Sequence, residues 1–419
     1  MRSLYWVKND LRFLDNEALS AFSNQSQSGL ICWFKSKSYN RAWEFRKQFI
    51  HESLSDFKKK LNTKDQDIYC FDQLAETEIP KLIQKYNIEK IFFTAEYSVE
   101  EIKTQNQITD FCKLNKIKYE IFDQQTLIQE INLPFKLDEM PFVFSDFRRS
   151  VEKQLVIQNP LAEPLKLPQK IEPEIFFELN PYSNKNIFSG GESEALKRLK
   201  NYIWVFDCLK DYKETRNGMI EMNDSTKLSP WLSLGCLSAR TIYQEIKKYE
   251  KTRISNQSTY WLFFELLWRD YFKFFSKKYK NKIFLKTGVT SNQQSQFAWP
   301  DAESDKKNKH LFQKWCEGAT QDQFINANMI ELKKTGWMSN RGRQNVASFL
   351  VHNSNLPWTW GAEYFEKMLI DYDPESNWGN WLYLSGKGSD PRAREFNTQK
   401  QAKDYDPQGL YQEKWLSQR

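Results

Sequence analysis

The sequence predicts a two-part protein, with an N-terminal α/β domain built on a parallel sheet and a C-terminal domain made of helices. Three observations support this fold class. Short apolar runs alternate with amphipathic stretches up to residue 132, prolines gather at 133–187, and helical spacing of apolar residues prevails from 188 to the end. Because 419 residues exceed one domain of ~100–200 residues, we expect domains at 1–132 and 188–419, joined by a long linker at 133–187.

Five apolar runs in the first part have the length of buried strands. They are residues 4–7, 30–34, 68–71, 91–94 and 119–122. Strands that are apolar throughout, with helical segments such as 45–61 and 79–86 between them, indicate a parallel sheet covered on both faces. No Gly-x-Gly-x-x-Gly follows the first run, so the usual dinucleotide fingerprint is absent.

The linker and the second part differ in composition from the first. Seven of the 14 prolines lie in 133–188, and 12 of the 15 tryptophans lie between Trp204 and Trp415. Residues 1–150 carry 22 basic and 22 acidic side chains, so the net charge of +7 belongs to the remainder. A basic, tryptophan-rich domain suits a polyanion or a flat aromatic ligand. A large aromatic core under a lysine-rich surface explains the same composition.

Residues 223–235 contain the first candidate ligand site. Ser229 followed by Pro230 is a good N-cap and first-turn pair, so we expect a helix to begin there. Hydroxyls, an ammonium group and free main-chain N–H groups around a helix start suit a phosphate. A plain capped helix is the alternative.

The predicted helix at 260–272 places a carboxylate and a guanidinium on an aromatic stripe with Trp261, Trp268 and Phe272. Burying Glu265 and Arg269 among aromatic rings is costly unless they are paired or used. The alternative is a simple Glu265–Arg269 pair four residues apart. The lysines at 273–282 that follow are interpreted as a solvated basic face.

Two polar segments in the last third complete the candidate site. Residues 337–345 concentrate asparagine and arginine, and residues 371–381 add two aspartates, two asparagines and two tryptophans. An arginine facing an aspartate beside buried indoles is a plausible way to hold a planar cofactor whose charge changes. A polar junction between helices is the alternative.

Motifs along nearly the whole chain resemble the photolyase/cryptochrome family, and in particular its DASH-type branch. The resemblance rests on residues 6–19, 190–196, 225–232, 265–272, 335–350, 371–381 and 396–406. It implies a Rossmann-like N-terminal domain and an all-α, FAD-binding C-terminal domain. It also suggests a folate antenna (5,10-methenyltetrahydrofolate) on the N-terminal domain, with Glu100 and Glu101 as the alternative contacts.

The resemblance implies roles for individual residues. Asn377 would face flavin N5, and Arg343 would pair with Asp371. The FAD contacts would be Tyr212, Ser225, Thr226, Lys227, Leu228, Ser229, Arg269, Arg343, Asp371, Asp373 and Asn377. Electrons would reach the photoexcited flavin through Trp381, Trp358 and Trp299.

The implied chemistry is light-driven electron transfer from reduced FAD to a cyclobutane pyrimidine dimer, mainly in single-stranded DNA. Glu265, Asn340 and Asn377 would be the catalytic residues, with Glu265 bonding the pyrimidine edge. The lesion and its phosphates would be held by Arg216, Trp268, Arg341, Gln344, Tyr383 and Arg394. Tyr383 replaces the tryptophan of dimer photolyases that act on duplexes. Asn340 replaces a histidine that the (6-4) photoproduct branch requires, which disfavours that branch.

Two other functions fit parts of the sequence. A blue-light photoreceptor with little repair activity would use flavin photoreduction to change its affinity for a partner. A nucleic-acid-binding flavoprotein without light chemistry would keep the basic bias but not the tryptophan relay. The chain has no 20-residue apolar run, no secretory leader and no Cys-x-x-Cys pair. We expect a cytoplasmic monomer with reduced thiols, no bound metal and no membrane contact.

Overall fold

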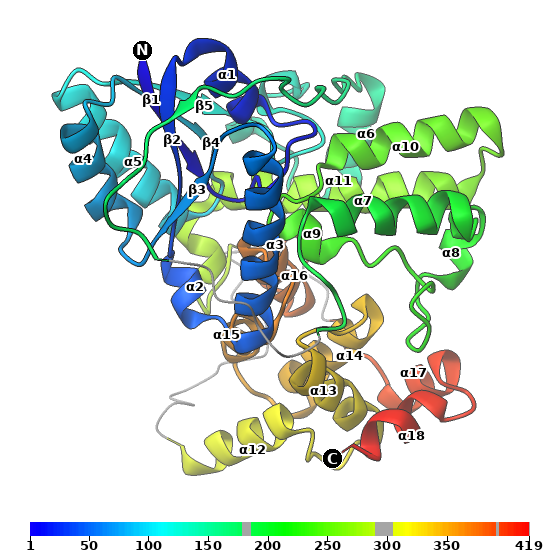
Figure 1. Cartoon of the computed structure of the whole chain (residues 1–419). Coiled ribbons are helices and arrows are strands. Elements are labelled where there is room, and N and C mark those ends of the chain that lie inside the picture. Colours follow the sequence, from blue (N-terminus) through cyan, green and yellow to red (C-terminus); the bar gives the residue numbers. More distant parts are fainter. Residues whose placement is uncertain (178–185, 290–304, 391–393, 419) are drawn as a thin grey trace.

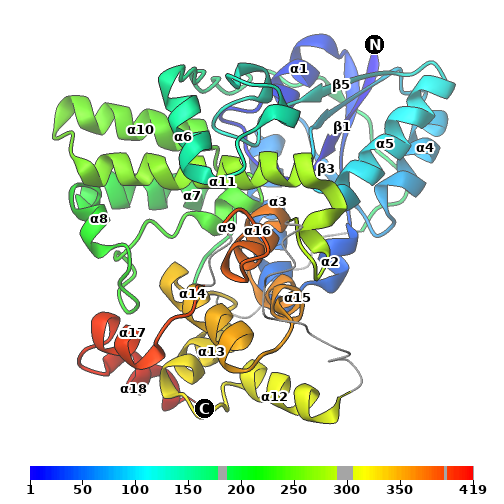
Figure 2. The ribbon, with the colours of Figure 1, turned by 180° about the vertical axis from the view of Figure 1, so that it is seen from behind.

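The protein is described from a computed structural model, in which the described residues are 1–177, 186–289, 305–390 and 394–418. Figure 1 shows the sheet and its helices above and to the left, and the C-terminal helices below. Figure 2 gives the opposite view. No helix among the described residues is long and apolar enough to cross a membrane.

The N-terminal domain is built on a parallel sheet with the strand order β3-β2-β1-β4-β5. Its strands are β1 (Arg2–Val7), β2 (Ser28–Phe34), β3 (Ile68–Phe71), β4 (Lys90–Thr94) and β5 (Lys118–Phe122). Each of the five predicted apolar runs forms one of these strands. The order reverses between β1 and β4, which pair from Ser3 with Lys90 to Trp6 with Phe93. Such a reversal opens a crevice at the carboxyl ends of the strands.

Alternate strand residues face two different cores, as the pleat requires. One face packs on α1 (Glu17–Gln25) and α3 (Glu44–Asn62), and the other packs on α4 (Ala75–Tyr86) and α5 (Val99–Leu114). Tyr5 and Val7 belong to the first core, and Leu4 and Trp6 to the second. The short helix α2 (Lys37–Arg41) follows β2.

The proline-rich segment contains structure of its own. It includes α6 (Phe144–Lys153) and the two-residue strand β6 (Gln169–Lys170), which pairs in parallel with β2. Phe144 and Phe147 of α6 are buried against the long helix α11 (Gln257–Tyr279). This segment therefore packs on both domains instead of only connecting them.

The rest of the described chain is helical, apart from turns and loops. It begins with α7 (Glu192–Lys200), α8 (Tyr212–Thr215), α9 (Ser229–Ser233) and α10 (Ala239–Thr252). After α11 come α12 (Lys306–Glu317), α13 (Gln323–Thr335), α14 (Asn340–Ser348), α15 (Trp358–Met368), α16 (Pro374–Leu384), α17 (Thr398–Tyr405) and α18 (Leu410–Leu416). One hydrophobic cluster continues from the α1/α3 face of the sheet into these helices, so the two domains share a core.

Candidate functional site

A cavity of about 460 Å³ lies among α9, α11, α14 and α16, and most of the predicted site residues line it. The predicted residues on its wall are Tyr212, Arg216, Ser225, Thr226, Lys227, Leu228, Ser229, Glu265, Trp268, Arg269, Asn340, Arg343, Gln344, Asp371, Asp373, Asn377, Trp381, Tyr383 and Arg394. The chain thus brings together side chains that are more than 180 residues apart in sequence.

The segment before α9 presents unused main-chain donors to this cavity. Arg198 binds the carbonyl oxygens of Ser225 and Thr226 from the side of α7, each at 2.9 Å. Within the described part of the chain, the N–H groups of residues 226–228 have no protein acceptor. Lys227 has a positive φ of 50°, and Leu228 is right-handed. Successive N–H groups in such alternating conformations form an anion-binding concavity.

The helix begins at Ser229 as predicted, but Ser229 is not its N-cap, and the helix is short. Leu228 is the N-cap of α9, which spans five residues, and no side chain caps it. The Ser229 hydroxyl instead donates to Asp371 Oδ2 at 2.6 Å, because that carboxylate lies across the cavity. The Lys227 ammonium donates to the Glu221 carbonyl oxygen and lies over the Trp337 ring, so it is already engaged within the protein.

The predicted Arg343–Asp371 pair forms. Arg343 Nη2 donates to both oxygens of Asp371, at 3.0 and 2.8 Å, and Arg343 Nε donates to the Met338 carbonyl oxygen. Asp371 is buried, and it also accepts the Ser229 hydroxyl. The contacts with Asp371 and the Met338 carbonyl oxygen fix the guanidinium group at the cavity wall. Its positive charge then lies beside any ligand in the cavity.

Lys273 is a site-supporting residue that the sequence interpretation missed. It was placed on a solvated basic face, but its side chain is buried and bridges Asp373 at 3.2 Å and Glu375 at 2.9 Å. Burial alone would raise the pKa of Asp373, but Lys273 and then Arg269 outweigh it and lower that pKa. The signal was present in the spacing, because Lys273 lies four residues after Arg269 on the same helix face.

Glu265 pairs with Arg216 and not with Arg269, so the simple i,i+4 pair considered from the sequence is absent from the described contacts. Arg269 donates instead to the carbonyl oxygens of Gln125 and Leu232. Burial raises the pKa of Glu265, while Arg216 acts in the opposite direction. The carboxyl group, which is 30% exposed, therefore lies at the cavity mouth with a raised pKa.

Two aromatic rings stand nearly perpendicular to each other at the mouth. Trp268 and Tyr383 have ring centroids 5.6 Å apart and an interplanar angle of 73°. Phe144 of α6 stacks on Trp268 with centroids 3.6 Å apart, so the linker helix supports this ring from behind. The two rings leave an L-shaped aromatic corner next to Glu265.

Two arginines line the same cavity, and a third bonds one of its lining residues. Arg216 lies over the Trp261 ring and Arg394 over the Tyr383 ring, at 5.2 and 4.7 Å from the centroids. Arg341 does not line the cavity, but it bonds Gln344 Oε1 at 2.9 Å and lies over the Tyr405 ring. All three have a buried Nε without a hydrogen-bond partner. Fixed guanidinium groups around an aromatic mouth suit a phosphodiester chain.

Of the three predicted relay residues, two lie in the described part of the chain. Trp381 lines the cavity, whereas Trp358 is fully buried in α15 and contacts the Trp378 ring at 5.8 Å. Trp299 lies outside the described residues. Asn377 donates its amide N–H to the Ala362 carbonyl oxygen at 3.0 Å, which fixes how this side chain faces the cavity.

A second cavity, of about 150 Å³, lies at the carboxyl ends of the strands where the strand order reverses. Trp6, Trp33 and Tyr39 contribute aromatic walls. Both candidate antenna carboxylates, Glu100 and Glu101, line it. Arg41 binds Glu100 at 2.6 Å, whereas burial first, and then Glu96, raises the pKa of Glu101 to about 8.

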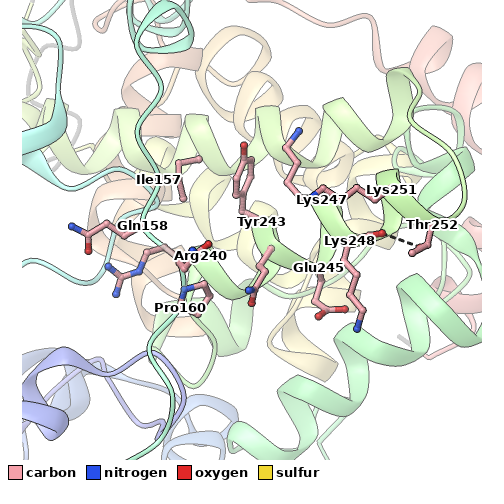
Figure 3. Close-up of a pocket in the computed structure, with 12 residues that line it drawn as sticks. Ile157, Gln158, Pro160, Arg240, Tyr243, Glu245, Lys247, Lys248, Lys251 and Thr252 are labelled. Carbon is pink, nitrogen blue, oxygen red and sulfur yellow. Dashed lines mark hydrogen bonds between the residues drawn. The ribbon is translucent and has the colours of Figure 1, made fainter.

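A third, more open cavity lies between α10 and linker residues 157–160 (Figure 3). Lys247 and Lys248 point away from each other in this view, and Lys247 is paired with Glu250 at 2.7 Å. Lys248 lies over the Trp204 ring. None of the predicted site residues lines this cavity, so we do not place the function here.

Comparisons with known proteins agree with this geometry. Residues 3–169 match the family described as DNA photolyase, and residues 261–418 match the FAD binding domain of DNA photolyase. The chain is 39% identical to cryptochrome DASH of Synechocystis over 99% of its own length and 87% of that protein. It is 40% identical to cryptochrome DASH of Xenopus laevis, covering 98% and 81% of the two chains.

Solved structures share the fold. The Synechocystis cryptochrome superposes with a TM-score of 0.91 at 38% identity, covering all of this chain and 89% of that one. The class III photolyase of Agrobacterium tumefaciens shares the fold at 23% identity, with a TM-score of 0.85 and coverage of 99% and 86%.

The residues around the main cavity fit FAD. The N–H groups at 226–228 and Arg269 supply donors for a pyrophosphate, and Trp381, Phe365 and Leu369 supply apolar wall for a planar ring. The matched domains, the near full-length relatives and this cavity lead to one identification. The chain belongs to the photolyase/cryptochrome family, within its cryptochrome DASH branch, and carries that family's FAD-binding domain.

Proposed function

We propose that this protein repairs cyclobutane pyrimidine dimers with blue light, mainly in single-stranded DNA. The observation that carries the proposal is the composition of the cavity mouth. An acid with a raised pKa, an aromatic corner and two arginines line the same cavity that fits FAD. A receptor that only signals would have no use for an acid at the base edge of a damaged nucleotide.

The chain's own residues would prepare the dimer for electron transfer. Reduced FAD, when bound, supplies the electron after absorbing light. Glu265, whose pKa is raised by burial, would in its protonated form donate a hydrogen bond to a pyrimidine carbonyl oxygen and stabilise the negative charge that develops there. Asn340, exposed at the start of α14, offers an amide to the same edge. Trp268 and Tyr383 take the flipped dimer between their faces and exclude water.

Binding to the strand would use the three rim arginines. Arg216, Arg341 and Arg394 contact phosphates, which gives affinity without reading sequence. A dimer in a duplex must first be unpaired and unstacked, at a cost of a few kcal/mol, whereas a single strand avoids most of this cost. We therefore expect the protein to favour single strands.

The second cavity is where we place an antenna chromophore. It is lined by Trp6, Trp33 and Tyr39 and lies where parallel sheets bind ligands. Glu101, whose pKa is raised to about 8, would be a neutral donor to a ring nitrogen or carbonyl at neutral pH. A folate and another flat chromophore both suit these walls, and absorption spectra of the purified protein after release of its chromophores distinguish them.

Replacing Glu265 tests repair against signalling. Glu265→Ala should lower the quantum yield of dimer splitting much more than it lowers affinity for the damaged strand. Glu265→Gln, which keeps an N–H donor at the same place, should retain more of the yield. Chromatography of restored thymines measures the yield, and fluorescence anisotropy measures the affinity. An unchanged yield in Glu265→Ala would favour the photoreceptor.

A further inference from the structure

The ring contacts of Trp381 include a tryptophan that is not part of the predicted three-tryptophan relay. Trp381 is 2% exposed and meets Trp315 edge to face, with centroids 6.2 Å apart and an interplanar angle of 72°. Phe365 contacts both rings. Among the described residues, the ring contact of Trp358 is with Trp378 and not with Trp381. The ring nearest to Trp381 is Phe365, with centroids 5.1 Å apart, and the tryptophan ring that Trp381 contacts among the described residues is Trp315 of α12.

Trp315 connects in turn to a tyrosine at the protein surface. Trp315 is fully buried, and Tyr364 of α15 is half-buried. Their rings lie 5.7 Å apart at 66°. The three rings thus lead from the cavity through Trp315 of α12 to Tyr364 of α15. Helix α12 lies at the outer edge of the helical domain (Figure 2). Each step joins two oxidisable side chains in direct contact.

The hydrogen bonds of these side chains suit rings that become positively charged when they give up an electron. Trp315 Nε1 donates to the Val346 carbonyl oxygen at 3.1 Å. A bond from an indole N–H becomes stronger when the ring carries positive charge, because the donor is then cationic. Tyr364 donates its hydroxyl to the Cys316 carbonyl oxygen at 3.1 Å and, being half-buried, can release its proton to water. A phenol that is oxidised must lose this proton.

We propose that Trp315 and Tyr364 form a second electron route from the surface to Trp381, used when light reduces oxidised FAD. The inference rests on the proposed light chemistry. Trp381 gives one electron to the photoexcited ring, Trp315 gives one to Trp381, and Tyr364 gives one to Trp315 while its proton leaves to water. A soluble thiol then returns a hydrogen atom to the neutral tyrosyl radical and becomes a thiyl radical.

The route is tested by flash spectroscopy and electron paramagnetic resonance on the FAD-loaded, oxidised protein. In Trp358→Phe, long-lived charge separation should persist, and it should be lost in Trp358→Phe/Trp315→Phe. Tyr364→Phe, which removes one hydroxyl from a half-buried ring, should abolish a tyrosyl radical signal that the unaltered protein shows. Equal lifetimes in the Trp358→Phe single and double variants, or a tyrosyl signal that survives Tyr364→Phe, would overturn the route.

Dimer repair by chemically reduced protein distinguishes a failure of this electron route from a failure of the proposed function on which it rests. Repair from a flavin that is already reduced needs no electron from the surface, so Tyr364→Phe should repair at the unaltered rate. If the tyrosyl signal is absent while repair is normal, the route is wrong and the function stands. If the unaltered protein, loaded with reduced FAD, repairs nothing, the proposed function itself is wrong.

Discussion

At the scale of single residues, the protonation of Glu265 at the cavity mouth depends on two opposing effects. These are its burial and the nearby guanidinium group of Arg216. Burial favours the protonated form, and Arg216 favours the ionised form. Arg216 is also the residue proposed to bind a phosphate of the strand. When Arg216 turns toward a phosphate, its electrostatic effect on Glu265 weakens. DNA binding would therefore favour the protonated form of Glu265, which the proposed repair uses.

The pH dependence of repair follows from this balance. Because the pKa of Glu265 is raised, the protonated form is complete at low pH and is lost as pH rises through that pKa. Arg216→Gln removes the charge that opposes protonation, so repair should persist to higher pH although the strand binds less tightly. The measurement is splitting yield against pH at saturating single-stranded substrate.

Glu265→Gln is the control for this prediction, because its amide does not titrate. Its profile should lack the decline with rising pH that the unaltered protein shows. If the splitting yield declined at the same pH in Arg216→Gln and in the unaltered protein, the decline could not be assigned to Glu265.

Individual partners in the site could be predicted only where sequence spacing fixes them. The stripe on the 260–272 helix correctly marked Glu265 and Arg269 as cavity residues, because positions four apart share a helix face. The true partner of Glu265 lies 49 residues away on another helix, which no local pattern reveals. Lys273 was misplaced for a related reason, since its two carboxylate partners come from α16.

At the scale of elements, the buried polar contacts of one tyrosine help to hold the last helix, among them a hydrogen bond to Asn328 Oδ1 at 3.1 Å. Tyr411 of α18 is fully buried and donates its hydroxyl to Glu331 Oε2 of α13 at 2.6 Å. Burial raises the pKa of Glu331 to about 7, and this hydrogen bond partly opposes the rise. The anchor also holds α13 and therefore the loop that leads into α14 of the site.

Tyr411→Phe should lower the free energy of unfolding by ~1–3 kcal/mol, because it leaves a buried carboxyl group without its donor. The loss should be larger near pH 8, where Glu331 is ionised in the unaltered protein, than near pH 6, where it is protonated in both proteins. Thermal unfolding at the two pH values measures this. Tyr405→Phe on α17, which keeps the ring beneath Arg341, is the matched control. A loss independent of pH would contradict the role given to Glu331.

Strands were easier to predict than helix ends or the linker. Apolar runs of four or five residues between helical stretches have few other placements, so all five predicted runs lie in strands, including the weaker one that contains Glu120. Ser229 begins α9 but does not cap it, because its hydroxyl bonds Asp371, a tertiary contact that outweighs its local preference as a cap. The packing of α6 on α11 was missed because prolines on both sides hid its three-turn periodicity.

At the scale of the whole molecule, a buried ion pair ties the sheet domain, the linker and the helical domain together. Arg240 of α10 binds Asp15 through Nε at 2.9 Å and Glu17 at 2.6 Å. Asp15 in turn exchanges two hydrogen bonds with the main chain of Leu161 in the linker. Both Arg240 and Asp15 are at most 2% exposed. The relative placement of the two cavities therefore depends on this contact.

Arg240→Met should destabilise the protein by ~3–5 kcal/mol, because it leaves Asp15 charged and buried without a partner. Adding Asp15→Asn should recover part of the loss, since the amide oxygen can still accept from Leu161. Denaturant unfolding followed by tryptophan fluorescence measures both. Lys247→Met, in an exposed pair on the same helix, should change little. A loss from Arg240→Met as small as that of Lys247→Met would show that the ion pair does not join the parts.

The claim that damaged bases meet a light-absorbing flavin in this cavity is tested most directly by counting restored thymines. Protein with fully reduced FAD is mixed with oligo(dT) that carries a single cyclobutane dimer, either alone or annealed to a complement, and is exposed to blue light or kept dark. We predict efficient restoration in the illuminated single strand, much less in the duplex and none in the dark. Tight binding of the damaged single strand with no thymine restored under light would contradict the account.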